Sequence, residues 1–194
     1  LVAIQLKGGT VRLFSAITET IDISEPDYPG ESIMSIAGGR IWKQSGQEDG
    51  EVTLEMYPIS IDQASDDQGL FQQFAGGTQD TSQPLATDTS WSVGTDRSRD
   101  RFIIAIMWTD DDTVNTAAEV LAPSGATGTD KVAIRFYAKE CRITSHKASF
   151  TDGILKITAT LKFPAFDAAG STRSYAWEST NDIGGNPIAD LSYS

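Results

Sequence analysis

Alternation of apolar and polar residues with a period of two constrains this chain more than any other feature. It is clearest over 154–163, where alternate residues form an apolar set and a polar set: Leu155, Ile157, Ala159, Leu161 and Phe163 against Lys156, Thr158, Thr160 and Lys162. Successive side chains of a strand point to opposite faces of the sheet. The pattern therefore predicts an antiparallel strand with one buried and one solvated face.

Neighbouring stretches extend this prediction to most of the chain. Residues 140–150 lead into Thr151-Asp152-Gly153, and an Asp-Gly turn between two alternating runs predicts one hairpin over 140–165. Upstream, Val132, Ile134 and Phe136 alternate with Lys131, Ala133 and Arg135. The first half is strand-like over 2–6, 11–23, 33–37, 40–44 and 52–57, with glycine-pair turns at 8–9 and 38–39. Residues 102–108 are apolar on both faces, which predicts a central strand or an interface strand.

The remaining segments complete the predicted architecture. Ser65 as N-cap, Gln68 and the apolar stripe that begins at Leu70 predict one helix ending at the glycine pair 76–77, and a weaker helical turn is indicated over 113–121 before Pro123. We expect a mainly β fold, an antiparallel β-sandwich or barrel with one short flanking helix, as a single domain over 1–194 with an extended loop 77–100 and a C-terminal arm 167–194. Both irregular segments carry aromatic residues, so they are expected to dock, either on another subunit or on their own domain.

The charge balance argues against a protein that grips nucleic acid. The chain has 15 Lys and Arg against 27 Asp and Glu, a formal net charge of −12. A protein that grips nucleic acid needs a basic face, and none is indicated here. An acidic, lysine-poor surface suits a halophilic source, although an ordinary acidic surface has the same composition. No apolar run approaches the length of a membrane span, so no membrane partner is expected.

No catalytic constellation is apparent. His146 is the only histidine, and Cys141 lies five residues away on the opposite face of a regular strand, so no Cys–His dyad is expected. No phosphate-binding glycine motif is present, and we expect no cofactor and no enzyme, with a carboxylate-dependent hydrolase as the third hypothesis. The run Asp110, Asp111 and Asp112 is a weak candidate for a cation site and otherwise a solvated turn. Four tryptophans could stack on sugars, fill the core or form subunit contacts: Trp42, Trp91, Trp108 and Trp177.

Two stretches carry a family resemblance. Residues 25–77 read EPDYPGESIMSIAGGRIWKQSGQEDGEVTLEMYPISIDQASDDQGLFQQFAGG, and residues 141–170 read CRITSHKASFTDGILKITATLKFPAFDAAG. The first resembles a major tail tube protein of a tailed virus in its order: a strand ending in a glycine pair, a charged loop, an alternating strand closing in Tyr-Pro, and a short helix. The second is similar to the late hairpin of that family. The acidic composition is similar to that of haloarchaeal tailed viruses.

The resemblance implies an architectural role in a siphovirus-like virion tail. Such subunits form hexameric rings whose sheets join edge to edge into an inner barrel, and the rings stack into a tube that conducts the genome during ejection. The implied partners are further copies of the chain, other tail proteins and double-stranded DNA that passes without specific binding. The alternative is a β-sandwich module of a virion that binds carbohydrate or a receptor.

The assembly hypothesis has its own candidate residues. Candidate subunit-interface residues are Trp91, Val93, Phe102, Ile104, Ile106, Trp108, Tyr175 and Trp177. The polar face of the 140–165 hairpin is the candidate lumen lining. Its Lys156 and Lys162 would attract DNA phosphates, so this assignment requires nearby acids to balance them.

Overall fold

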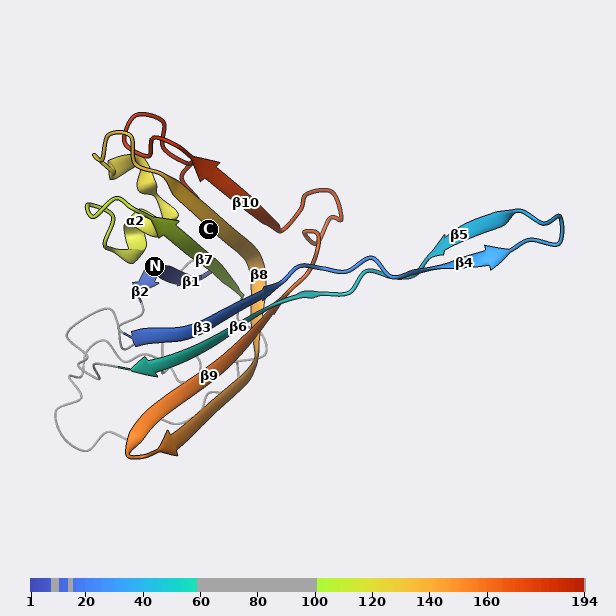
Figure 1. The fold of residues 1–194 in the computed structure, drawn as a ribbon, viewed down its shortest axis with the longest axis horizontal. Helices are drawn as coiled ribbons and strands as arrows, with labels where there is room; N and C mark the ends of the chain where they lie inside the picture. Colours follow the sequence, from blue (N-terminus) through green and yellow to red (C-terminus); the bar gives the residue numbers. More distant parts are fainter. Residues whose placement is uncertain (8–10, 14–15, 59–100, 194) are drawn as a thin grey trace.

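The computed structural model describes residues 1–7, 11–13, 16–58 and 101–193 (Figure 1). In these ranges the chain is mainly β, with antiparallel pairing throughout and one short α-helix, as the sequence predicted. The helix expected to start near Ser65 and the loop 77–100, with Trp91 and Val93, lie outside the described residues. None of the helices in the described ranges is long and apolar enough to cross a membrane.

One long strand organises the fold. Strand β8 (Ala133–Thr151) has 19 residues and joins two halves of an eight-stranded sheet. Half-sheet A contains β1 (Val2–Leu6), β2 (Val11–Leu13), β7 (Phe102–Thr109), β10 (Tyr175–Thr180) and residues 133–141 of β8. Half-sheet B contains β3 (Ala16–Ser24), β6 (Gly50–Pro58), β9 (Ile154–Phe163) and residues 142–151 of β8.

The boundary between the half-sheets is a bend in β8 at Glu140. This residue has φ 59°, and the pairing with β7 shifts beside it, because Phe102 faces Cys141 while Ile104 faces Ala138. An extra residue on one strand of an antiparallel pair bends that strand. The sequence predicted separate strands over 131–137 and 140–150, and the structure runs them together through this bulge.

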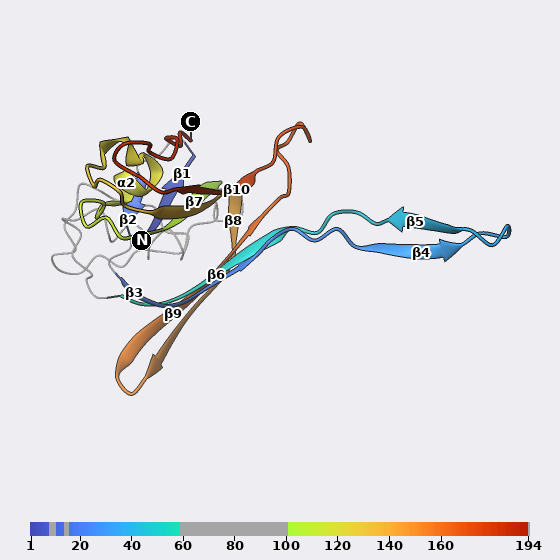
Figure 2. The same cartoon turned by 45° about the horizontal axis from the view of Figure 1, so that its top comes forward.

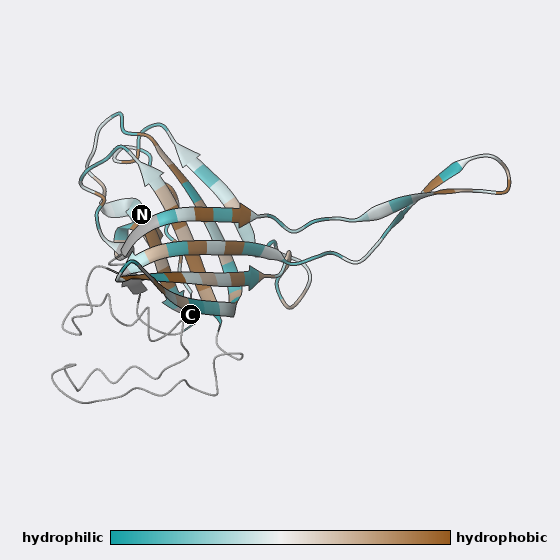
Figure 3. Ribbon diagram, turned by 60° about the horizontal axis from the view of Figure 1, so that its bottom comes forward, coloured by the Kyte–Doolittle hydropathy of each residue, from teal (hydrophilic) through white to brown (hydrophobic). Residues whose placement is uncertain are grey.

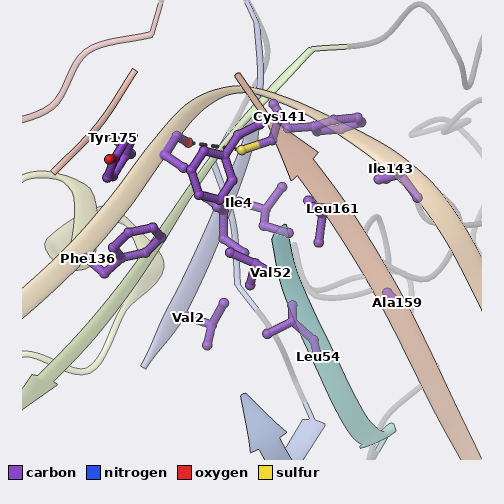
Figure 4. Packing of buried hydrophobic residues seen from close by; sticks show 14 of the residues in the cluster. Val2, Ile4, Val52, Leu54, Phe136, Cys141, Ile143, Ala159, Leu161 and Tyr175 are labelled. Atoms are coloured by element: carbon purple, nitrogen blue, oxygen red, sulfur yellow. Dashed lines mark hydrogen bonds between the residues drawn. The ribbon is translucent and has the colours of Figure 1, made fainter. Parts of the chain in front are cut away.

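The main core lies between the two half-sheets. Figure 4 shows side chains of β1, β6, β8 and β9 packed against one another, among them Ile4, Leu54 and Leu161, each exposing 1% or less of its surface. The apolar set predicted for β9 is buried here: Ile157, Ala159, Leu161 and Phe163, with Leu155 half-buried at its end. Cys141 is also in this core, and its thiol donates to the carbonyl of Ala138 at 3.2 Å.

The turn between β8 and β9 follows the predicted Asp-Gly chemistry. Asp152 has φ 52° and Gly153 has φ 78°. Positive φ at both central residues is the two-residue hairpin turn whose twist matches that of the flanking strands. The hairpin predicted over 140–165 is therefore confirmed, and its strands pair from Arg142 with Lys162 to Thr151 with Ile154.

The outer face of half-sheet A is covered by a second, smaller core. Helix α2 (Ala117–Leu121) lies over it and starts with a capping box in which Thr116 and Glu119 bond each other's backbone N–H. A 3-10 turn η1 (Pro123–Gly125) follows at the predicted break. The weaker helical turn expected over 113–121 is thus the described helix.

The second core also buries a face of β8 that the sequence predicted to be polar. The sequence placed Ala133 and Arg135 on the polar side of their strand, but both are completely buried, whereas Ile134 is 46% exposed. Arg135 donates to the carbonyls of Val120 and Leu121 at 3.0 Å and to Glu178 at 2.7 Å. The prediction was wrong because this half-sheet is covered on both faces, so a charged residue lies inside where carbonyls and a carboxylate satisfy it.

The C-terminal segment forms part of this second core. Strand β10 pairs with β8, and Ile183, Ile188 and Tyr193 expose 8% of their surface or less. Arg135 donates to the carbonyl of Ala189 as well. The segment expected as an arm over 167–194 therefore packs on its own domain over 174–193, which was the alternative to docking on another subunit, while residues 168–173 are exposed.

Candidate assembly surfaces

The hairpin formed by β4 (Gly30–Met34) and β5 (Arg40–Gln44) projects far from both half-sheets (Figures 1 and 2). We call residues 30–44 the arm. Its two strands pair only with each other among the described strands, from Gly30 with Gln44 to Met34 with Arg40. A tight turn closes the tip, where Gly38 has φ 79° and its N–H donates to the carbonyl of Ser35 at 2.9 Å.

Apolar side chains on the arm are exposed. The exposed fractions are 43% for Ile33, 69% for Met34, 110% for Ile36, 61% for Ile41 and 65% for Trp42. An isolated two-stranded hairpin is only marginally stable in water, and an exposed apolar group of this size marks a contact site. The sequence predicted these two strands and their turn but not their projection from the domain.

The solvated face of half-sheet B is polar and carries its own ion pairs. Figure 3 shows the alternation of hydrophilic and hydrophobic bands along its strands. Lys156 lies 2.8 Å from Glu19 and 3.1 Å from Glu55, and Lys162 lies 3.6 Å from Glu51. Hydrogen bonding to Glu19 and Glu55 raises the pKa of Lys156, and the Lys156 and Tyr57 donors lower the pKa of Glu19. Acids on β3 and β6 therefore balance the two lysines that the sequence left unbalanced.

The candidate interface residues fall into two groups. Phe102, Ile104 and Tyr175 are at most 5% exposed in the subunit's own core, and Ile106 is half-buried against it. These four have little or no free surface in one copy. Trp108 is 59% and Trp177 is 53% exposed, so these two remain available.

Trp108 and Trp177 lie near the end of half-sheet A. They pair with Ile134 and Phe136 of β8, two positions apart, which places both tryptophans on one face of the sheet. Trp177 contacts the ring of Phe136 at 5.0 Å between centroids and donates to Glu25 at 2.7 Å. Trp42 is on the arm, so the three described tryptophans do not form one sugar-stacking platform.

Two carboxylates of the aspartate run accept hydrogen bonds from nearby loop residues. Asp111 is buried and accepts from the hydroxyl of Thr113 at 2.7 Å and from the N–H of Gly128 at 2.9 Å, and these donors lower the pKa of its carboxyl group. Asp110 accepts from the N–H of Val132 at 2.8 Å. Across the described ranges, no three His, Cys, Asp or Glu side chains are grouped to hold a metal ion.

The predicted placement of Cys141 and His146 on opposite faces of their strand is wrong. A bulge between Ile143 and Ser145 adds a residue, so that Ile143 faces Leu161 and His146 faces Ala159 on the same side. Cys141 and His146 therefore lie on one face, contrary to the prediction. At roughly 3.3 Å per residue they are still about 15 Å apart along the strand. Burial also raises the pKa of the Cys141 thiol, which keeps it protonated and inert.

Comparison with known proteins gives structural likenesses only. No family model matches the chain, and no curated protein matches it. A chain of the sheath–tube complex of the PVC extracellular contractile injection system has a TM-score of 0.45 and 11% identity, covering 92% of this chain and 88% of that chain. A chain of the sheath/tube terminator of that system has a TM-score of 0.42 and 11% identity, covering 91% and 92%. An Hcp protein has a TM-score of 0.37 and 10% identity, covering 93% and 98%. TM-scores of this size assign no function to this chain.

Proposed function

We propose that this protein is the structural subunit of a viral tail tube, in which copies form stacked, hexameric rings around a lumen that conducts the genome. The arm is the observation that carries the proposal. It extends a row of apolar side chains away from both cores of the described residues, and no described residue outside the arm covers them. Contact with another copy would remove this apolar surface from water, which stabilises the assembly by about 25 cal/mol for each Å² buried.

The polar face of half-sheet B suits the lumen of such a tube. Lys156 and Lys162 on this face are paired with acids at 2.8–3.6 Å, and the hydroxyls of Thr53 and Thr160 lie 3.4 Å apart. A lining without unpaired excess of positive charge releases few counterions when DNA enters. Double-stranded DNA then slides along the lining rather than binding to it.

The exposed residues beside the core fit the same role. Trp108 and Trp177 are large aromatic side chains on one face at the rim of the domain, and such residues are common anchors of protein interfaces. We propose that they contact a neighbouring copy or another tail protein in the virion. The proposed activity is mechanical, with no reaction catalysed.

Arm substitutions test this function. We expect the purified protein to form rings or tubes, visible by negative-stain microscopy and as a high-mass species in light scattering. The variant Met34→Ser/Ile36→Ser removes apolar surface that is 69% and 110% exposed. It should remain monomeric under the same conditions with an unchanged Tm, because neither side chain contributes to a core.

The matched control keeps the arm apolar. Met34→Leu/Ile36→Leu should assemble as the unsubstituted protein does. A protein that stays monomeric at every concentration would overturn the proposed function. Normal rings from the serine variant would instead show that the arm is not the assembly contact.

A further inference from the structure

Strand β10 is an open margin of half-sheet A. It pairs with β8 on one side, and no described strand pairs with its other side (Figure 1). Just before β10, the N–H of Lys139 donates to the carbonyl of Ser174 at 2.7 Å. Residues of an antiparallel strand bond a given neighbour at every second position. Within β10, Tyr175, Trp177 and Ser179 therefore direct their backbone N–H and C=O groups to the open side.

This edge is more regular and less charged than the other open edges of the described sheet. Strand β2 has only three residues, while β3 and the second half of β8 each contain a bulge and charged residues. Strand β10 has no register shift against β8. Its one charged residue, Glu178, accepts two hydrogen bonds from the buried Arg135, at 3.0 and 2.7 Å. A regular edge without lysine, proline or a bulge is a template for pairing with an extended chain.

Apolar side chains line one face of the sheet beside this edge. Trp177 is 53% exposed, and Ile134 and Trp108 on the strands behind it are 46% and 59% exposed. Ile134 pairs with both Trp108 and Ser179, so these three residues form one row across half-sheet A. Because the Ser179 side chain is small, a large apolar side chain placed opposite it can lie across it and contact Ile134. An added strand would thus bury apolar surface at two positions, opposite Trp177 and opposite Ser179.

Acidic groups flank the same edge. The carboxylate of Glu25, which is exposed, accepts from the indole N–H of Trp177 at 2.7 Å. On the other face, both bonds from Arg135 to Glu178 end on Oε2, and no described group donates to its Oε1. Glu178 can therefore accept from a further donor. The chain has a formal net charge of −12, which attracts a cationic partner.

We infer that the open edge of β10 binds an extended segment of another protein in which apolar and basic residues alternate. Apolar residues of the segment lie opposite Trp177 and Ser179, and the basic residue between them lies opposite Glu178. Its backbone bonds the open N–H and C=O groups, so that half-sheet A gains one strand. The inference rests on the proposed function, in which Trp177 contacts a neighbouring copy or another tail protein, and it assigns that contact to a different protein.

A second copy of the chain fits this edge poorly. Pairing β10 with the same strand of another copy would bring Glu178 close to its own counterpart, and like charges across a strand pair are destabilising. The acids of β3 would do the same. The basic half of β8 has an apolar–basic–apolar order only at Cys141, Arg142 and Ile143, whose apolar members are buried in their own core. Strand β2 has this order too, but its three residues offer half the length of β10.

A synthetic peptide tests the edge directly. The probe is a capped six-residue peptide, the length of β10, in which lysine alternates with valine and phenylalanine. We expect it to bind in fluorescence anisotropy and to slow amide hydrogen exchange at Trp177 and Ser179. The N–H groups of Ala176 and Glu178 already bond β8, so their exchange should change less.

Two control peptides test the pattern. One has the same composition with its lysines grouped at one end, and the other has glutamate in place of lysine. Each should bind at least about tenfold more weakly than the alternating peptide, since the first cannot place apolar residues on one face and the second adds acids to an acidic edge.

Ser179→Pro is the matched protein variant. Proline here removes an N–H that faces the open side and leaves the bonds to β8 in place, which an edge strand tolerates. It should weaken binding of the alternating peptide about tenfold, whereas Ser179→Ala, which keeps the N–H, should bind as the unsubstituted protein does. A thermal transition in both variants checks that they fold, and if Ser179→Pro does not, the exchange at Trp177 decides.

Three results would overturn the inference. These are no binding of the alternating peptide, equal binding of the alternating and grouped peptides, and binding that leaves exchange at Trp177 unchanged. A dimer of the unsubstituted protein that Ser179→Pro abolishes in sedimentation velocity would also overturn it, because the occupant would then be a second copy. Peptide binding by a protein that never forms rings would uphold the edge and overturn the proposed function.

Discussion

Two hairpins of similar sequence pattern behave differently in this molecule. The β8–β9 hairpin buries the core end of its apolar set, where Ala159, Leu161 and Phe163 are 0% exposed. The arm leaves Ile41 and Trp42 61% and 65% exposed. Both turns have a glycine at nearly the same φ, 78° at Gly153 and 79° at Gly38. The local chemistry of strand and turn is thus shared, and only the presence of an opposing sheet differs.

This difference separates folding from assembly. Half-sheet B is stabilised by half-sheet A, so its apolar residues contribute to the free energy of unfolding of one copy. The arm has no such neighbour among the described residues, and its apolar residues can contribute only when another surface covers them. Substitutions in the two hairpins should therefore affect different measurements.

The largest expected effect comes from a matched truncation in each hairpin. Leu161→Ala removes fully buried apolar volume and should lower the free energy of unfolding by about 3 kcal/mol in urea unfolding of dilute protein. Ile41→Ala should change it by less than about 0.5 kcal/mol, because Ile41 is exposed. Equal destabilisation by the two substitutions would mean that the arm folds back onto the domain and that the comparison fails.

The strands were readable from the sequence because their signals are local. Alternation over 154–163 identified the face of β9 that is buried, and Asp152-Gly153 identified the turn. The same signals identified the strands and turn of the arm. Whether a neighbour covers a strand is not encoded in its alternation, so the projection of the arm could not be predicted.

Long-range contacts account for the predictions that failed. From its place in the alternating pattern, Arg135 was expected to be solvated. It is buried because α2 and Glu178, which are distant in the sequence, supply its hydrogen-bond acceptors. The bulge beside Thr144 reverses the side of every following residue in β8, and no sequence signal marks it. The candidate interface residues were only partly separable for the same reason: Trp108 and Trp177 are exposed, whereas Phe102 and Tyr175 are buried by strands that are distant in the sequence.

A smaller effect is expected at the two turn glycines. Gly153→Ala forces alanine into the left-handed region and should lower the free energy of unfolding by about 1 kcal/mol, because this turn joins two strands of the core. Gly38→Ala imposes the same strain at φ 79° but should leave the thermal transition of the domain unchanged. A drop in Tm from Gly38→Ala would indicate that arm and domain unfold together.

The smallest expected effect is a change in Tm at acid pH that arises from the domain and not from the arm. The Thr113 hydroxyl and N–H and the Gly128 N–H lower the pKa of Asp111 in the folded state. A lowered folded pKa stabilises the protein fully above the ordinary aspartate pKa of about 4, and the stabilisation is lost as the pH falls through the folded value. Asp111→Asn should therefore lower Tm at pH 7, and the difference from the unsubstituted protein should narrow below about pH 4. Glu31→Gln is the control on the arm, where the carboxylate is exposed and 4.0 Å from Lys43, and it should leave Tm unchanged across this range. A Tm difference for Asp111→Asn that stays constant down to pH 2 would mean that the lost hydrogen bonds, rather than the charge, account for its effect.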